Sequence, residues 1–331
     1  MAVTLLVITV VSYTLMRLAP GDPVRTQMVG GEDLRTVDAE RKESETERIL
    51  REKYHLDKHP IIGYGYWLGG IITRFDWGTS ISVSKGTPVM QLIRERIGPT
   101  LRLNICAIVL VYLCAVPLGI FSTLMRGSAF RAIIERFVSL GLFVLYSLPR
   151  FWVGPLLLMF FCGDLFLNIF PVAGIEPSRL DTFGKSYWAI LGMTARYYVL
   201  PVFCLTYTGL AGLSRYTRVG MLEVTKQDYI RTARAKGLSE WTVVMKHIMR
   251  NSLIPLITLF AALLPGLIAG SVIIEYIFSI PGMGQLSLMA LNSRDYPMMM
   301  ALFTIGATLT LIGILLSDLL YAAADPRITY E

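Results

Sequence analysis

The chain alternates between long apolar stretches and segments rich in charged and polar residues. The apolar stretches contain no Asp, Glu, Lys or Arg, except that Arg150 interrupts the third. Since the core of a bilayer is crossed by about 20 consecutive apolar residues in an α-helix, we predict six transmembrane helices. They are expected within residues 1–16, 103–125, 137–163, 197–214, 251–274 and 296–317.

The third stretch contains two apolar runs, 137–149 and 151–163, on either side of Arg150. We interpret it as one helix bent at Pro149, and two separate spans are the competing count. Short loops rich in Lys and Arg stay on the cytoplasmic side. Arg126, Arg131 and Arg136 therefore place the loop before this stretch in the cytoplasm.

Residues 215–250 contain eight Lys or Arg and three Asp or Glu, which gives a second cytoplasmic signal. Two loops on the same side must be separated by an even number of spans. If the bent stretch 137–163 is one span, it and the span at 197–214 give the two that are needed. Both termini are then expected in the cytoplasm. Residues 20–100, with twelve basic and twelve acidic side chains, are expected on the outer side.

The composition supports an all-α integral membrane protein. Hydrophobic residues make up 54% of the 331 and charged residues only 17%, with a mean hydropathy of +0.55. A soluble domain has about 25% charged residues, and a disordered chain has far less apolar surface, so both classes are excluded. The net charge of +7 arises mostly within 215–250, so we predict no nucleic-acid partner.

The cysteines lie in apolar stretches without CxxC spacing and are expected to be small buried hydrophobes rather than metal ligands. They are Cys106, Cys114, Cys162 and Cys204.

Three regions organise the chain. Residues 1–19 form the first transmembrane helix; cleavage as a signal peptide is a weaker alternative, because the stretch has no basic start and no A-x-A site. Residues 20–100 form an extracytoplasmic region with a charged surface helix over 38–54 and an amphipathic helix after Pro88 along the outer membrane surface. Residues 101–331 form a five-helix core with a cytoplasmic loop at 223–250.

The segment 223–255 is more structured than a connecting loop requires. Residues 228–236 favour a short helix, and Gly237 suits the left-handed position that ends one. Ser239 is a good N-cap, with Leu238 and Val243 spaced as a hydrophobic staple. We therefore predict a helix, a sharp turn and a second helix, which together form a rigid handle on the inner surface.

This handle has an apolar and a basic group of residues. Tyr229, Ile230 and Ala233 are expected to form an apolar patch, beside a basic rim of Arg231, Arg234 and Lys236. A protein partner could act on such a surface. A basic helix that holds anionic lipid is the alternative.

Several patterns suggest catalysis or metal binding but are incomplete. The tract ending Gly184-Lys185-Ser186 has Arg179 where a P-loop needs glycine, and Gly282-Met283-Gly284 has Ser287 where a dinucleotide loop needs its third. His55 and His59, with Asp57, are expected to be solvated rather than metal ligands, and His247 has no carboxylate or Cys partner nearby in sequence.

An intramembrane enzyme is the second class of function. Asp164, Glu275 and Asp318 are the acids nearest membrane depth, and an Asp164–Asp318 pair could serve such an enzyme. All three lie near predicted span ends, however, so positions at the membrane interface are favoured.

The tract DYIRTARAKGLSE at 228–240 resembles the coupling loop, or EAA loop, of binding-protein-dependent ABC importer permeases, in the form found in the oligopeptide/dipeptide branch. Further tracts agree in order along nearly the whole chain, with His59 before Pro60 as a one-residue departure from the family's LDKP. These tracts include RLAPGDP at 17–23, DWGTS at 76–80, EYIFSIPGMG at 275–284, RDYP at 294–297 and DPRI at 325–328.

This resemblance implies a six-span permease with the type I ABC importer fold. It implies a homologous second permease, two ABC ATPases that hold ATP and Mg²⁺, an extracytoplasmic substrate-binding protein, and peptide cargo; this chain itself is expected to hold no cofactor and no metal and to perform no catalysis. Related permeases carry nickel complexes, glutathione or other small solutes, which remain the alternative cargo.

The resemblance assigns the ATPase contact to the coupling loop: Asp228, Tyr229, Ile230, Arg231, Thr232, Ala233, Arg234, Ala235, Lys236, Gly237, Leu238 and Ser239. Polar residues within the spans could line the transport pathway, although hydrogen bonding inside the helical bundle is the favoured explanation for them. They are Asn104, Ser139, Thr206, Thr208 and Ser271.

Overall fold

The computed structural model describes most of the chain, and the statements below concern that part alone. The described residues are 1–18, 48, 52, 57–124, 129–163, 166–172, 174–177, 182–252, 256, 259 and 263–324. The predicted surface helix over 38–54 falls almost wholly outside them.

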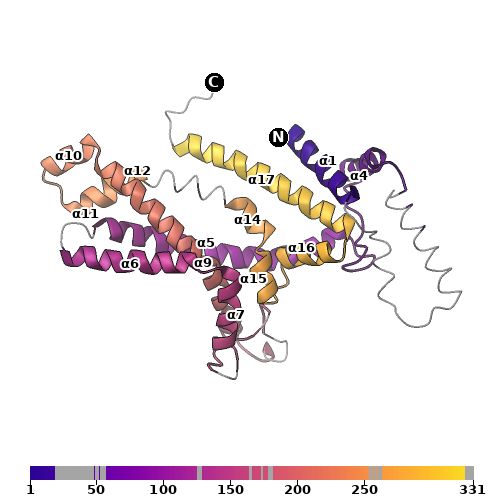
Figure 1. Ribbon diagram of the computed structural model, residues 1–331, viewed down its shortest axis with the longest axis horizontal. Helices are drawn as coiled ribbons and strands as arrows, with labels where there is room; N and C mark the ends of the chain where they lie inside the picture. Colours follow the sequence, from indigo (N-terminus) through magenta and orange to yellow (C-terminus); the bar gives the residue numbers. More distant parts are fainter. Residues whose placement is uncertain are drawn as a thin grey trace. The chain divides into compact units, whose positions relative to one another are not determined.

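Within these residues the secondary structure is helical, apart from one isolated bridge between Thr79 and Pro88. Figure 1 shows the helices in chain order. They are α1 (Ala2–Leu18), α4 (Pro60–Arg74), α5 (Val89–Leu124), α6 (Ala129–Ser147), α7 (Arg150–Phe161), α9 (Tyr187–Thr225), α10 (Asp228–Ala235), α11 (Glu240–Thr242), the π-helical turn η1 (Val243–Ile248), α12 (Met249–Ser252), α14 (Leu264–Ala269), α15 (Val272–Ile277), α16 (Met283–Asn292) and α17 (Tyr296–Ala324).

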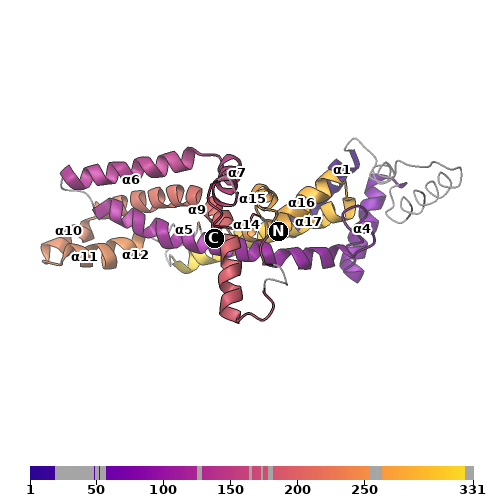
Figure 2. The ribbon, with the colours of Figure 1, turned by 90° about the horizontal axis from the view of Figure 1, so that it is seen from below.

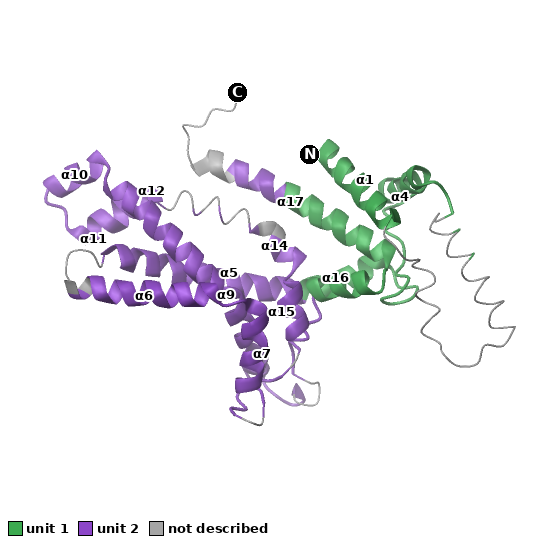
Figure 3. Ribbon diagram, viewed as in Figure 1, with its two compact units in different colours: residues 1–98, 283–311 green, residues 99–282, 312–331 purple. Residues whose placement is uncertain are grey.

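The chain forms two compact units (Figure 3). Unit 1 contains residues 1–98 and 283–311, and unit 2 contains residues 99–282 and 312–331. In unit 1, one buried cluster joins the start of α5 to α16 and α17, and a second joins α1 to α4 and α17. The division of the sequence at residues 19 and 100 stays a prediction.

Three described helices have the length and apolarity to cross a bilayer: α5, α9 and α17. The α6–α7 pair would make a fourth, with a 97° bend between its halves. The predicted break occurs because the residue before a proline avoids the helical region: α6 ends at Ser147, and Pro149 is extended with φ −67° and ψ 133°. α1 and residues 266–277 are shorter apolar helices, so the count of six spans remains a prediction.

The predicted amphipathic helix after Pro88 is not a separate surface helix. It is the first part of α5, which continues through Pro99 and Pro117 to Leu124. Val89, Leu92 and Ile93 are buried in a cluster of unit 1 that includes Met283, Leu286 and Met298 from α16 and α17. Its apolar face therefore packs against protein and not along the membrane surface.

The stretch 251–274 was expected to be one continuous helix, and its described part is interrupted. α14 ends before Gly270, whose φ of +81° is left-handed and favours glycine, and α15 begins at Val272. A turn at Ser279–Gly282 then leads into α16, a ten-residue helix that the sequence pattern did not predict.

Two of the four cysteines differ from expectation. Cys162 and Cys204 are buried, as predicted, whereas Cys106 and Cys114 are exposed on α5. Apolar periodicity is weak on a helix that is apolar all round, so the sequence could not show which face of α5 is covered.

In unit 2, α5 and α9 come into close contact at Gly119. A Cβ atom on this residue would lie 2.6 Å from Cβ of Thr217 and 2.8 Å from the carbonyl oxygen of Ser214. Small residues allow helix backbones to approach in this way.

We expect Gly119→Ala to lower the free energy of unfolding by about 1–3 kcal/mol through overpacking, visible as a lower thermal unfolding temperature of the purified permease. Gly212→Ala on α9 is the matched control, because a Cβ there meets nothing within 4 Å, and alanine is the better helix former. Equal unfolding temperatures for the two variants would contradict this interpretation of the contact.

Candidate functional site

The predicted handle is present as a hairpin of short helices, residues 226–252, which we call the coupling hairpin. α9 ends at Thr225, the chain turns through Lys226 and Gln227, and α10 begins at Asp228. An acidic residue in the first turn is favourable at the positive end of a helix dipole. Figure 2 shows α10 and α11 beyond the end of α9 in unit 2.

Gly237 closes α10 in the left-handed conformation that was predicted, with φ +76°. Its N–H donates to the carbonyl oxygen of Arg234 at 2.9 Å. A Cβ atom would meet nothing within 4 Å, so glycine is required here by backbone conformation and not by lack of space.

The predicted serine cap is also present. The hydroxyl of Ser239 accepts the N–H of Thr242 at 3.3 Å, and α11 begins at Glu240. The helix then continues as η1 into α12. Val243 is buried while Leu238 is 40% exposed, and a staple between these two side chains stays a prediction.

The inner face of the coupling hairpin is a small hydrophobic core. Ile230 is fully buried and Ala233 is 6% exposed. The core is completed by one residue of α9 and three of η1: Met221, Val243, Val244 and Ile248. The prediction that Ile230 and Ala233 belong to an exposed patch is therefore wrong, because these side chains fix the hairpin to α9.

The outer face carries exposed aromatic and apolar side chains. Tyr229 is 42% exposed, Leu238 40% and Trp241 64%. The hydroxyl of Tyr229 accepts a hydrogen bond from the side-chain amide of Asn251 at 2.7 Å, which holds α10 to α12. Trp241 was not among the predicted contact residues, although tryptophan is enriched among the residues that contribute most to protein interfaces.

The basic residues of the hairpin are exposed. The Arg234 guanidinium pairs with the Glu240 carboxylate across the Gly237 turn, with Nε–Oε1 2.7 Å and Nη2–Oε2 3.3 Å. Arg231 is 75% exposed and lies 3.6 Å from Asp228. Exposed pairs of this kind contribute less than about 1 kcal/mol, so the basic face is available to a partner.

Four of the five polar side chains predicted within spans make hydrogen bonds inside unit 2, which supports the favoured explanation for them. Asn104 donates to the Leu267 carbonyl at 3.1 Å, and Thr206 donates to the Val202 carbonyl at 2.6 Å. The remaining three residues have partners in the same unit: Ser139 donates to Glu135 at 2.9 Å, Thr208 accepts from Arg150 at 2.8 Å, and the backbone N–H of Ser271 donates to Glu275 at 3.3 Å. A role in lining a pathway stays a prediction.

Glu275 lies in the interior of the protein, and its predicted position near a membrane interface stays a prediction. Its side chain is fully buried, and Oε1 accepts the Thr100 hydroxyl at 3.0 Å. Gly282 packs directly on this pair, since a Cβ there would lie 2.5 Å from both Glu275 Oε2 and Thr100 Oγ1. The glycine of the PGMG tract therefore makes room for a buried carboxylate.

Asp295 is a second buried carboxylate that sequence reasoning missed. It is fully buried at the start of α17 and accepts the Met298 N–H at 3.2 Å, as a helix N-cap does. Its other oxygen, Oδ2, accepts four hydrogen bonds from one loop: the Ser80 hydroxyl at 2.5 Å and the N–H groups of Ile81, Ser82 and Val83 at 3.0, 2.9 and 3.1 Å.

The intramembrane-enzyme alternative gains nothing from the structure. Asp318 is exposed and Asp164 is outside the described residues, so their pairing has no support. Among the described residues, no cluster of three or more His, Cys, Asp or Glu could hold a metal.

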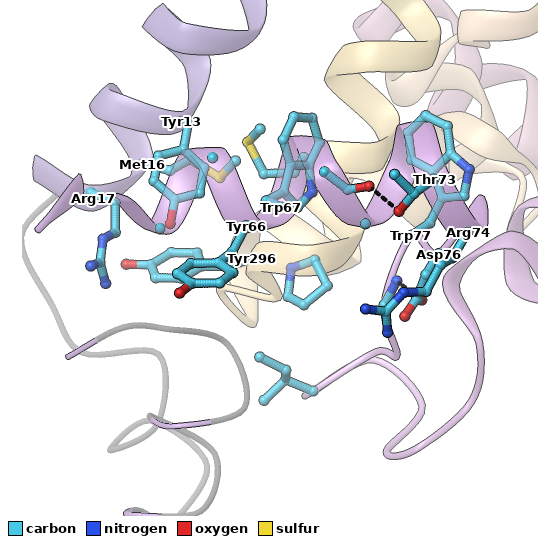
Figure 4. Close-up of a pocket in the computed structure, with 18 residues that line it drawn as sticks. Tyr13, Met16, Arg17, Tyr66, Trp67, Thr73, Arg74, Asp76, Trp77 and Tyr296 are labelled. Carbon is cyan, nitrogen blue, oxygen red and sulfur yellow. Dashed lines mark hydrogen bonds between the residues drawn. The ribbon is translucent and has the colours of Figure 1, made fainter. Parts of the chain in front are cut away.

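Unit 1 contains an aromatic cavity of about 540 Å³, bounded by α1, α4, residues 76–81 and the start of α17 (Figure 4). Glycines of α4, including Gly63 and Gly69, form part of its wall, and Trp67 and Trp77 are among its aromatic lining residues. The lining is mostly apolar, with Arg17, Arg74 and Asp76 as its charged members. A lining of this kind suits the binding or packing of apolar groups.

Comparisons with known proteins agree with the geometry. Residues 115–330 match the family described as "Binding-protein-dependent transport system inner membrane component". The chain is 38% identical to the oligopeptide transport system permease protein AppB of Bacillus subtilis, over 98% of this chain and 95% of that protein. It is 34% identical to the dipeptide permease DppB of the same organism (99% and 94% covered) and 33% identical to DppB of Escherichia coli (99% and 96%).

A chain of the inward-facing MetNI methionine ABC transporter, in its CY5 native crystal form, has a similar fold. The TM-score is 0.54 at 17% identity, covering 71% of this chain and 97% of that chain. The fold is thus that of a type I ABC importer permease. Together, the family match over residues 115–330 and the full-length relatives show that the chain belongs to the family of inner membrane components of binding-protein-dependent transport systems.

Proposed function

We propose that this chain is one of two permease subunits of an ABC importer for peptides, and that ATPase subunits dock on its coupling hairpin. The observation that carries the proposal is the two-sided construction of the hairpin. Its inner face is buried against α9, while Tyr229, Leu238 and Trp241 are exposed on its outer face. A partner that binds the outer face can move α9 because the inner face is already fixed to it.

The cargo is inferred from the relatives. The proteins compared above are permeases of oligopeptide and dipeptide systems, which favours peptides over nickel complexes, glutathione or another small solute. The substrate would come from an extracytoplasmic binding protein and cross between this chain and a homologous second permease.

The energy source is assigned to other subunits. ATP and Mg²⁺ would be held by the partner ATPases, and this chain would hold no cofactor of its own. With residues 215–250 on the cytoplasmic side, as their basic excess requires, both termini lie in the cytoplasm and residues 20–100 on the outer side. The orientation is tested with single cysteines in place of Lys85 and Lys236, which are both exposed. Only the cysteine at position 85 is expected to react with a label added from outside.

The docking surface is tested by charge reversal. We expect Arg231→Glu together with Arg234→Glu to reduce co-purification of the ATPase about tenfold, which corresponds to about 1.4 kcal/mol. The reason is that acidic side chains would then face the acidic surface that a basic docking face requires on its partner. The measurement is the ratio of ATPase to permease after affinity purification of the assembled transporter. Arg74→Glu, an exposed arginine on α4, is the control, and an unchanged ratio in the double variant would reject docking at this surface.

A further inference from the structure

Glu135 on α6 connects three helices of unit 2. Its Oε1 accepts the Ser122 hydroxyl of α5 at 3.1 Å and the Ser139 hydroxyl of α6 at 2.9 Å. The same oxygen forms an ion pair with Arg218 of α9. The two charged side chains are only 14% and 27% exposed, so the carboxylate is the meeting point of α5, α6 and α9.

Arg218 has few polar partners other than Glu135. Within the described chain, the buried Nε of Arg218 has no hydrogen-bond partner. A charge in so little water is costly unless it is paired, so Arg218 depends on Glu135, and the helices that carry them are held at this point.

α6 is held to α9 at its other end as well. The Tyr207 hydroxyl of α9 donates to the Leu148 carbonyl at 2.8 Å, directly after α6 ends. Thr208 of α9 accepts from the Arg150 guanidinium at the start of α7. On α9, residues 208 and 218 are ten residues apart, or about 15 Å.

Between these two attachments α6 and α9 are separated by a groove of about 480 Å³ that is open on one side, where Phe143 is 62% exposed. The groove is bounded by α5, α6 and α9, with Leu142 and Phe143 of α6 and Ala211 and Gly212 of α9 in its lining. Figure 2 shows α6 running alongside α9. α6 is thus fastened by polar contacts at both ends and has free volume beside its middle.

The attachment made by Glu135 and Arg218 is close to the coupling hairpin. Arg218 precedes the end of α9 at Thr225 by seven residues, about 10 Å. Met221, between them, is fully buried in the hydrophobic core of the hairpin. The inner end of α9 and the hairpin therefore form one packed body, to which Glu135 fastens α6.

We propose that Glu135 is a positioning residue that makes α6, and the α7 segment bent from it, follow the movement of α9 and the coupling hairpin. The inference rests on the proposed function. Without the carboxylate, the groove lets α6 stay behind while α9 moves, so ATP is hydrolysed without the pathway opening.

The test uses the full transporter in proteoliposomes. Glu135→Gln is expected to assemble at the wild-type yield and to keep at least half the wild-type ATPase rate, while peptide taken up per ATP falls at least fivefold. The charge swap Glu135→Lys with Arg218→Glu is expected to restore that ratio to within twofold of wild type. Glu95→Gln, an exposed acid on α5, is the matched control. An unchanged ratio in Glu135→Gln, a loss only in proportion to assembled complex, or a swap without recovery overturns the proposal.

A second measurement does not depend on peptide. Spin labels at exposed Phe137 of α6 and Val219 of α9 are expected to keep one distance with and without ATP in the wild type, and a broadened distribution in Glu135→Gln. The same narrow distribution in both proteins overturns the proposal. If the wild type itself takes up no peptide, the proposed function fails, and the label distances still decide the role of Glu135.

Discussion

Replacing Gly237 by valine is expected to abolish most uptake while the permease still folds and inserts. The left-handed conformation costs an L-residue about 1–2 kcal/mol, and a β-branched side chain adopts it least readily. Since a side chain there meets nothing within 4 Å, the cost arises from the backbone. Valine relieves it by changing φ from +76°, which alters the angle between α10 and α11.

The new angle has consequences on the outer face. The Arg234–Glu240 pair spans this turn, and Ser239 caps α11 directly after it. We expect at least tenfold less uptake per assembled transporter, with ATPase activity that no longer responds to substrate-loaded binding protein.

Gly237→Asn is the matched control, because asparagine tolerates the left-handed region far better than valine does. It is expected to keep more than half of wild-type uptake. Normal uptake by a well-expressed Gly237→Val, or equal loss in both variants, would show that the turn conformation does not matter for coupling.

The local turns and caps of unit 2 were predictable because they depend on neighbouring residues. The left-handed Gly237, the Ser239 cap and the break at Pro149 each follow from the conformational preference of one residue, and each is present. Side-chain burial is different. Ile230 is covered by Val243 and Ile248, residues beyond the turn, and an eight-residue helix does not show in its sequence which face a later segment will cover.

The buried carboxylates show the same limit at longer range. Glu275 meets Thr100 across 175 positions of sequence, and Asp295 meets Ser80 across 215. In the sequence, Glu275 follows one apolar stretch and Asp295 precedes another, and neither position shows that the carboxylate is buried inside the protein. The partners that make burial possible for Asp295 are backbone N–H groups, which every residue carries, so no residue type marks the loop that supplies them.

Asp295→Ala is expected to destabilise unit 1 more than any other exchange considered above. Four donors, three of them backbone N–H groups of residues 81–83, lose their common acceptor at Oδ2, and α17 loses its cap. A buried donor left without a partner costs about 1–3 kcal/mol, so a loss of about 3–5 kcal/mol is expected after partial rescue by water. Asp295→Asn should cost less, about 1–3 kcal/mol by the same reasoning, because its one oxygen can face either the loop or Met298 but not both.

Hydrogen exchange separates this local effect from general unfolding. In the wild type, the amides of Ile81, Ser82 and Val83 are expected to exchange slowly because each donates to the carboxylate. In Asp295→Ala they should exchange at least tenfold faster, while the amides of the coupling hairpin, in unit 2, keep their wild-type rates. Asp57→Ala, an exposed acid of the same unit, should change neither set. Slow exchange at residues 81–83 in Asp295→Ala would mean that the loop is held by other contacts and that the carboxylate only caps α17.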